Sequence, residues 1–169
     1  MILRDGVLAG THVVVAGAGE LGEAVRERAA ALGAAVTLRE VDPHGEEVPF
    51  EGAADVLVYD APAGMQAALD GAWLTIRPVA RAAMIEHGGG LIVLLAPRPG
   101  SAEAEAARAG LENLARTLSV EWARFAVRPV AILPGDATSP AEVAELVAFL
   151  ASAAGAYYSG CAFTLGAVG

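Results

Sequence analysis

Three glycines near the amino end of the chain have the spacing of a phosphate-binding turn. Gly17, Gly19 and Gly22 form the pattern G-x-G-x-x-G between a short apolar run and an amphipathic segment. In that context the first glycine permits a tight turn, the second lets a pyrophosphate approach the backbone, and the third lets helix and strand pack closely. We expect the free amides of the first helical turn, including those of Glu20 and Leu21, to face the phosphates of a dinucleotide.

A carboxylate further along the chain bears on which dinucleotide would bind. Glu40 follows the glycine pattern at close to the spacing of about 20 residues at which an acidic side chain holds the ribose hydroxyls. Such a carboxylate repels a 2′-phosphate, which favours NAD over NADP, although the neighbouring Arg39 weakens the preference because it could attract that phosphate. The alternative interpretation is a tight turn that binds nothing, with Glu40 merely in contact with water.

The elements that must position these residues alternate between strands and helices. Such alternation implies a parallel sheet covered on both faces. We therefore predict a single Rossmann-like α/β domain over residues 1–169, with a doubly wound parallel sheet of about six strands. The predicted strands are 13–15, 35–38, 55–59, 91–95, 127–133 and 162–165. The first predicted helix follows the glycine pattern and ends near residue 32, and the others span 67–86 (kinked or broken at Pro78), 102–124 and 140–152.

Composition narrows the range of partners. The 169 residues carry a net charge of −9, which disfavours binding to nucleic acid or to an anionic membrane surface. The single Cys161 and three scattered histidines predict neither an internal disulfide nor a metal site. No apolar run reaches the length of a membrane span, and residues 1–5 lack the apolar core of a signal peptide, so a cytoplasmic location is the expectation.

Several longer motifs resemble the short-chain dehydrogenase/reductase family. Residues 55–62, D-V-L-V-Y-D-A-P, are similar to the family's D-x-L-V-N-N-A-G, and residues 134–138 resemble its P-G-x-x-x-T segment near the nicotinamide, one residue short. Shorter similarities lie at 90–93, 110–116, 149–152 and 158–160. The resemblance implies NAD or NADP as cofactor, and it adds Asp60, Pro134, Gly135 and Thr138 to the expected cofactor contacts.

The sequence also departs from the family's pattern. Family members place a helix, a strand and another helix before the D-x-L-V-N-N-A-G motif, but only residues 41–54 remain here, so one strand–helix unit is predicted to be missing. The wall that would flank adenine is then altered. The family's usual T-G-x-x-x-G-x-G is replaced by the pattern above, and the region after Gly135 is too short for a substrate-covering loop.

The positions that carry the family's chemistry hold residues that cannot perform it. Aligned on residues 109–111, the family lysine falls on Arg108, its tyrosine on Ala104 and its serine near Ala96 and Pro97, while 69–75 contain no asparagine. The family's reaction passes a proton through the tyrosine hydroxyl, whose pKa the lysine lowers, and alanine cannot exchange a proton. No catalytic residue is therefore predicted, and the resemblance implies an impaired or non-catalytic member.

Three other side chains could act as displaced acids or bases. Tyr59 and Asp60 end a predicted strand at the edge where ligands of such sheets bind, and Glu105 lies in the first turn of a helix. Each has a stronger structural interpretation, since a tyrosine at a strand end usually packs and a glutamate at a helix start usually serves the helix dipole.

Two function classes and one type of partner follow. The first class is a protein that binds a dinucleotide or only assembles; the second is an NAD(P)-dependent oxidoreductase with altered catalytic residues. Family members pair their two long helices between subunits, so the resemblance implies a homodimer or tetramer, whereas the alternative is that these helices only cover the sheet. The apolar residues that suggest pairing are Trp73, Leu74, Ile76, Val79, Met84, Trp122 and Phe125.

Overall fold

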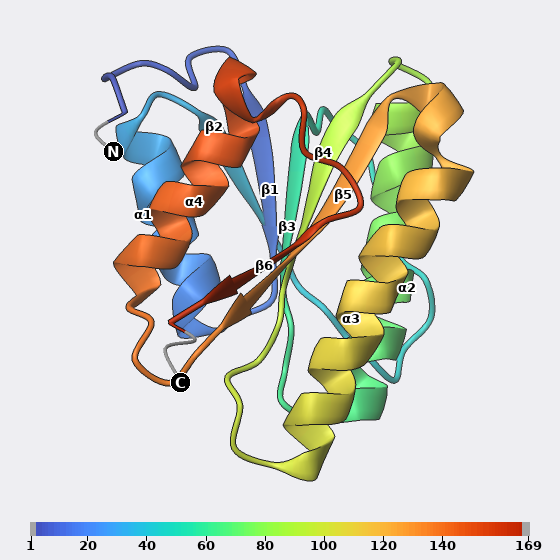
Figure 1. Cartoon of the computed structure of the whole chain (residues 1–169). Coiled ribbons are helices and arrows are strands. Elements are labelled where there is room, and N and C mark those ends of the chain that lie inside the picture. The colour runs from blue at the N-terminus through green and yellow to red at the C-terminus, as the bar shows by residue number, and fades with distance from the viewer. Residues whose placement is uncertain (1–2, 167–169) are drawn as a thin grey trace.

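The computed structural model describes residues 3–166 and shows one parallel sheet between two layers of helices (Figure 1). The six strands are ordered β2-β1-β3-β4-β5-β6, and each neighbouring pair is parallel. The predicted Rossmann-like α/β fold is therefore confirmed. The elements are β1 (His12–Ala16), α1 (Glu20–Ala31), β2 (Ala35–Arg39), β3 (Val56–Asp60), α2 (Met65–Val79), β4 (Gly90–Leu95), α3 (Ala102–Glu121), β5 (Val127–Pro134), α4 (Pro140–Ala151) and β6 (Ala162–Leu165).

The strand order locates the missing unit. A Rossmann sheet of order 3-2-1-4-5-6 has a further strand outside its second strand, whereas here β2 is the edge of the sheet. Residues 40–55 connect β2 to β3 without a helix or strand. This connection packs Val41 and Phe50 against the core beneath α2 and α3, and its Glu47 pairs with Arg77 of α2. A loop thus covers part of the surface that a helix would otherwise cover.

Alternating side chains on the strands build two cores. Val13 and Val15 of β1 face α1 and α4, whereas Val14 and Ala16 face α2 and α3. β3 and β4 repeat this alternation and are buried on both faces, which explains why they are continuous apolar runs in the sequence. In Figure 1, α1 and α4 cover one side of the sheet and α2 and α3 the other.

Three helix ends have clear sequence signals. Gly33, which follows the predicted end of the first helix near residue 32, has a φ of +95°, a conformation that favours glycine. α3 begins at the Ser101 cap, whose hydroxyl accepts from the amide of Ala104, and α4 begins with a capping box between Ser139 and Glu142. These caps satisfy amides that would otherwise lack partners at the two helix starts.

Two helix predictions need correction. Of the kink or break predicted at Pro78, the break is wrong, because α2 continues to Val79 and then widens into a π-helix, Ala80–Ile85. The predicted helix 102–124 ends earlier, at Glu121, and a 3-10 turn, Ala123–Phe125, follows. The chain reverses there to enter β5, and Ala126 takes a left-handed φ of +56° in that reversal.

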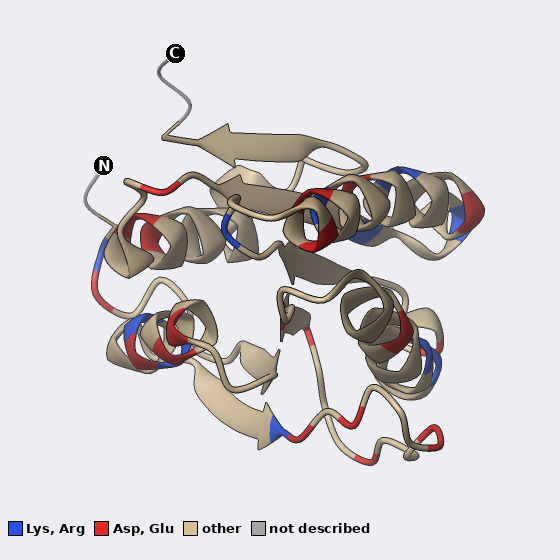
Figure 2. Ribbon diagram, turned by 90° about the horizontal axis from the view of Figure 1, so that it is seen from below, with Lys and Arg blue, Asp and Glu red and all other residues tan. Residues whose placement is uncertain are grey.

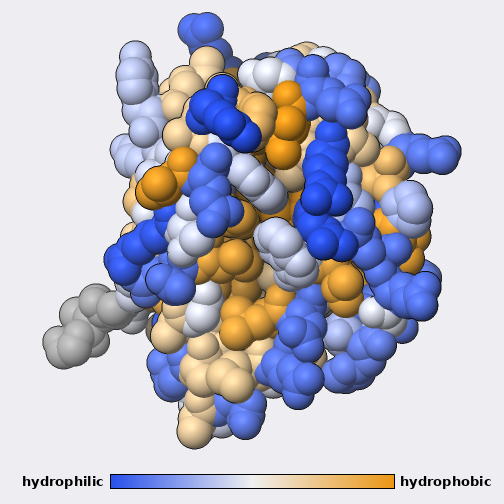
Figure 3. All heavy atoms as spheres, turned by 90° about the vertical axis from the view of Figure 1, so that its right-hand side faces the viewer, coloured by the Kyte–Doolittle hydropathy of each residue, from blue (hydrophilic) through white to orange (hydrophobic). Residues whose placement is uncertain are grey.

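The apolar residues of α2 and the π-turn belong mainly to the core. Ile76 and Val79 of α2 and Met84 of the π-helix are fully buried in the core on this side of the sheet, whereas Trp73 is 39% exposed. Figure 3 shows the side of the molecule formed by α2 and α3, where apolar side chains are interspersed with polar ones. Three of the residues that suggested pairing between subunits are thus accounted for by packing within one chain.

Over residues 3–166, no helix has both the length and the apolar character that a membrane crossing requires. Among the same residues, no group of three or more His, Cys, Asp or Glu side chains is arranged to hold a metal ion.

Candidate nucleotide site

A groove lies at the carboxyl ends of β1 and β2, where ligands of open α/β sheets bind. Its volume is about 760 Å³. Figure 2 views this edge of the sheet from below and shows acidic residues along the loop that follows β2. We call this hollow the nucleotide groove. It is lined by Val15, Gly17, Ala18, Gly19, Gly22, Glu23, Leu38, Arg39, Glu40 and Val41.

The three glycines form a tight corner between β1 and α1, as predicted. Gly17 has a φ of +101°, and a Cβ atom there would lie 2.4 Å from the carbonyl oxygen of Asp60. A Cβ atom at Gly19 would lie 2.4 Å from the Oδ2 atom of Asp60. α1 begins at Glu20, directly after the corner, so the amides of Glu20 and Leu21 lie in its first turn, which has no intrahelical acceptors. The Leu21 side chain points into the core.

Asp60 occupies part of the space that the glycines leave. Its Oδ2 atom accepts a hydrogen bond of 2.7 Å from the amide of Gly22, the third amide of α1. Burial raises the pKa of the Asp60 carboxyl, the Gly22 amide opposes that rise, and the charge of Glu20 adds to it. A carboxylate therefore already holds one of the amides that the sequence assigned to a phosphate. The glycine spacing has a second physical reason, which is the close approach of Asp60.

The residues at the end of β2 have separate tasks. Glu40 is exposed at the rim of the nucleotide groove. The Arg39 guanidinium instead donates to the carbonyl of Val48 and lies 5.8 Å from the ring centroid of Phe50. These contacts hold Arg39 against the 40–55 connection. Among the described residues, no such contact holds Glu40 to that connection.

A smaller hollow of about 370 Å³ continues from the nucleotide groove across the end of β3. Val41 and Pro43 of the connection form one wall, and Ala61 and Pro62 lie at the end of β3. The connection that replaces the missing strand–helix unit therefore supplies an apolar wall beside the glycine corner. Sequence reasoning did not identify this wall, because residues 42–54 show no periodic pattern.

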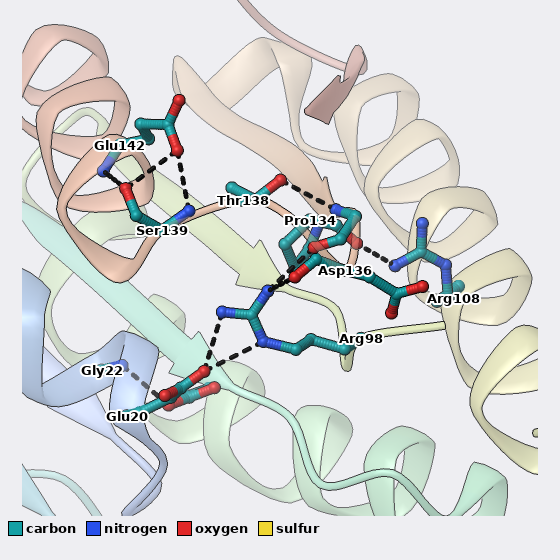
Figure 4. A network of polar contacts seen from close by, with 11 residues as sticks. Glu20, Gly22, Arg98, Arg108, Pro134, Asp136, Thr138, Ser139 and Glu142 are labelled. Atoms are coloured by element: carbon teal, nitrogen blue, oxygen red, sulfur yellow. Dashed lines mark hydrogen bonds and ion pairs between the residues drawn. The ribbon is translucent and has the colours of Figure 1, made fainter. Parts of the chain in front are cut away.

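Arg98 spans the crevice between the glycine corner and the β5–α4 loop, and sequence reasoning missed it. Its Nε and Nη2 atoms donate to one Glu20 oxygen, Oε1, at 2.9 and 2.8 Å. Its Nη1 atom donates to the carbonyl oxygens of Gly135 and Asp136 at 2.8 and 3.4 Å. We call these contacts the Arg98 bridge (Figure 4). Its only sequence signal is a cationic residue three positions after the end of a buried strand.

Arg108, at the position of the family lysine, ties two loops together. It is buried, and its Nη1 atom donates to the carbonyl oxygens of Pro97 and Pro134 at 2.8 and 2.7 Å. Figure 4 shows its guanidinium directed at the end of β5. Arg108 thus holds the ends of β4 and β5 in place through their backbone.

The β5–α4 loop is held by its own contacts. The Thr138 hydroxyl accepts from the amide of Gly135 at 3.0 Å, and that amide also donates to the carbonyl of Leu165. Thr138 is buried. The structure therefore brings Pro134, Gly135 and Thr138 to the same sheet edge as the glycine corner, with the Thr138 hydroxyl engaged within its own loop.

The candidate displaced acids and bases have structural partners. The Tyr59 side chain is fully buried, its hydroxyl donates to the carbonyl of Ala68 at 3.1 Å, and burial strongly raises its pKa. Glu105 lies on the surface 3.6 Å from the Nε atom of Arg108. At the family's serine and tyrosine positions, Ala96 and Ala104 are buried methyl groups. These contacts give Tyr59 and Glu105 roles in packing and charge pairing.

The site fits the two halves of a dinucleotide unequally. An adenosine half placed here would meet a groove, a glycine corner, an apolar wall and the Glu40 carboxylate. On the other side, the Arg98 bridge joins Glu20 to the β5–α4 loop, which the family resemblance places near a nicotinamide. In a dinucleotide held here, the α1 amides would donate hydrogen bonds to the pyrophosphate. The chemistry that a nicotinamide ring supplies is hydride transfer.

Two solved dehydrogenases have this fold. The chain is similar to the citronellol catabolism dehydrogenase (AtuB) of Pseudomonas aeruginosa PAO1, with 24% identity and a TM-score of 0.80 over 96% of each chain. It is also similar to a hydroxysteroid dehydrogenase from Escherichia coli, with 19% identity and a TM-score of 0.81 over 98% of this chain and 99% of that one. These likenesses confirm the short-chain dehydrogenase/reductase-like fold that the sequence motifs implied. No family model matches the sequence.

Proposed function

We propose that this chain is a dinucleotide-binding protein that holds the adenosine half of NAD in the nucleotide groove and does not catalyse hydride transfer. The observation that carries the proposal is the pairing of a glycine corner with alanine at the position of the family's proton-transferring tyrosine and near that of its serine. The corner starts a helix beside a groove of about 760 Å³. Ala96 and Ala104 have no exchangeable side-chain proton.

NAD is the preferred dinucleotide of this proposal because of charge. Glu40 lies exposed at the groove, and Arg39 is held by Val48 and Phe50. A 2′-phosphate would meet a carboxylate without a free cation to offset it, and charge repulsion would weaken its binding. The dehydrogenase names of the two similar structures support a nicotinamide dinucleotide as the class of ligand.

Catalysis is lost in this proposal because Arg108, at the position of the family lysine, has no tyrosine hydroxyl beside it and binds backbone carbonyls instead. A lysine at this position would lower the pKa of a neighbouring tyrosine hydroxyl. Here the neighbour one helical turn earlier is Ala104, and the Arg108 guanidinium instead donates hydrogen bonds to two backbone carbonyls. Tyr59 cannot substitute, because its hydroxyl is buried against α2 with a raised pKa.

Titration of the full chain with NADH, followed by fluorescence, tests the proposal. We expect saturable enhancement of NADH fluorescence, weaker binding of NADPH, and no oxidation of NADH above the protein-free rate in a screen of aldehydes and ketones. Turnover would instead support the alternative, an oxidoreductase with altered catalytic residues. Absence of binding at millimolar NADH would leave only a role in assembly.

We also propose that the chain forms homo-oligomers through the α2–α3 side. Trp73 and Val120 are exposed there, at 39% and 79%, although the deeper apolar residues serve the core. Light scattering coupled to size-exclusion chromatography measures the mass directly, and a mass of 17.1 kDa at micromolar concentration would contradict this proposal.

A further inference from the structure

We propose that Arg98 is the phosphate-binding cation of this site, and that it exchanges Glu20 for the pyrophosphate of the bound nucleotide. This inference rests on the proposed function, because it requires a nucleotide in the groove. It assigns to Arg98 a ligand contact and to Glu20 the role of an internal competitor.

A cation beside the glycine corner would offset the local negative charge that an anion meets there. Asp60 lies in the corner with its Oδ2 atom on the Gly22 amide, and Glu20 and Glu23 lie in the first turn of α1. The whole chain carries a net charge of −9. Backbone amides contribute only partial charges. A pyrophosphate would therefore be repelled by nearby carboxylates unless a full positive charge lay beside it.

Three arginines lie at this edge of the sheet, and two of them are committed. The chain contains no lysine, so arginines are its cationic side chains at neutral pH apart from histidine. Arg108 is buried and bonded to two carbonyls, and Arg39 is bonded to the 40–55 connection. Arg98 remains, and its main acidic partner lies on the glycine-corner side of the crevice.

The geometry of the Arg98 bridge allows the exchange. Nε and Nη2 share the single oxygen Oε1 of Glu20, and the Glu20 side chain is 62% exposed. An exposed ion pair of this kind stabilises a protein very little. Nη1 stays on the carbonyl of Gly135, so the guanidinium remains anchored to the end of β5 while its other edge changes partner.

The new partner would be better matched than the old one. A pyrophosphate presents several charged oxygens, and the planar edge of a guanidinium binds two of them at once. Glu20 is the first residue of α1, and Gly22 and Glu23 of the same turn line the nucleotide groove, so Arg98 is held beside that turn. The arrangement therefore favours ligands with a pyrophosphate over adenosine alone.

Calorimetric titration with ADP and with adenosine at low ionic strength separates the phosphate contribution from the rest. For Arg98→Gln we expect ADP binding to weaken tenfold or more, because a charge-assisted hydrogen-bonded contact is lost. Adenosine binding should change less than about twofold, within the scatter expected for a removed group that does not touch the ligand. For Glu20→Gln we expect ADP to bind about threefold tighter or more, since the competitor is neutralised.

The double variant Arg98→Gln/Glu20→Gln tests the exchange itself. If Glu20 acts through Arg98, the gain from Glu20→Gln should shrink to the small effect of a removed charge once Arg98 is absent. Glu27→Gln on α1 and Arg116→Gln on α3 are matched controls that alter the same charges away from the crevice, and neither should change ADP affinity. Circular dichroism establishes that each variant is folded; if Arg98→Gln is not, Glu20→Gln and Arg98→Lys decide.

The outcomes distinguish this inference from the proposed function. If the wild-type chain binds neither ADP nor adenosine, the proposed function fails and this inference fails with it. If it binds ADP but Arg98→Gln binds equally well, the function stands and the exchange is wrong. Tighter ADP binding by Arg98→Gln would also overturn it, because Arg98 would then be closing the site rather than serving it.

Discussion

Asp60 places a carboxylate in the glycine corner, where a backbone amide favours its charge and burial disfavours it. Its carboxylate caps the third amide of α1, yet burial raises its pKa, so the ionised form is held at a cost. Because the folded-state pKa lies above the unfolded value, Asp60 contributes stability that is complete below the unfolded pKa. That contribution is lost as the pH rises through the folded pKa. A neutral residue of the same shape would avoid this loss.

Asp60→Asn is therefore expected to stabilise the protein at neutral pH. The amide oxygen can still accept from Gly22, and no charge is buried. We expect a gain on the order of 1 kcal/mol, or about 2–4 °C in Tm for a chain of this size, shrinking toward zero in acid. Thermal unfolding at several pH values measures it, and a loss of Tm at pH 8 would contradict the account. The same variant should bind ADP more tightly at pH 8.

Arg108 is expected to contribute stability rather than catalysis. In Arg108→Met the carbonyls of Pro97 and Pro134 lose a charged donor inside the protein. We expect a loss on the order of 3 kcal/mol in the free energy of unfolding, measured with urea. Arg116→Met, which removes an exposed pair with Glu112, should cost less than about 1 kcal/mol. Equal effects of the two substitutions would show that the buried contacts have no special weight.

At the scale of elements, the reversal between α3 and β5 carries a local strain. Ala126 has a φ of +56°, where a residue with a Cβ atom is disfavoured by about 1–2 kcal/mol. Ala126→Gly should therefore raise the free energy of unfolding by about 1 kcal/mol. Ala109→Gly, at an exposed position within α3, should lower it by a similar amount. Destabilisation by both substitutions would contradict this interpretation of Ala126.

The sequence predicted the elements well because their signals are local. Apolar runs marked the buried strands, and Gly33 follows the predicted end of the first helix, where its φ of +95° ends the helix. The Ser139 capping box was not predicted, although α4 begins where the helix 140–152 was expected. The end of α3 was predicted late because Trp122 and Phe125 continue the apolar period, although they pack against the core from a cap and a 3-10 turn. Periodicity alone does not distinguish these cases.

The candidate site was only partly predictable, because its deciding contacts join distant segments. Gly17, Gly19 and Gly22 were found from their spacing, which is a local signal. The hydrogen bond from Gly22 to Asp60 joins residues 38 positions apart, and the one from Arg98 to Glu20 joins residues 78 positions apart. Neither pair has a spacing pattern, so only the folded sheet reveals that Asp60 enters the corner and that Arg98 faces it.

At the scale of the whole molecule, charge should decide between dinucleotides. The acidic connection after β2 and Glu40 face a ligand that approaches this edge of the sheet (Figure 2). We expect Glu40→Gln to narrow the difference in affinity between NADH and NADPH severalfold, mainly by improving NADPH binding. Fluorescence titration at low salt measures both affinities. An unchanged ratio would mean that Glu40 does not face the ribose.

The most direct test of the central claim is to map the nucleotide onto the backbone amides. Nuclear magnetic resonance of the ¹⁵N-labelled chain, titrated with NAD⁺, reports each amide separately. We expect the largest shifts at residues 17–22 and near Glu40, with α4 and β6 unchanged. Saturable shifts confined to another part of the molecule, or none at millimolar NAD⁺, would contradict it.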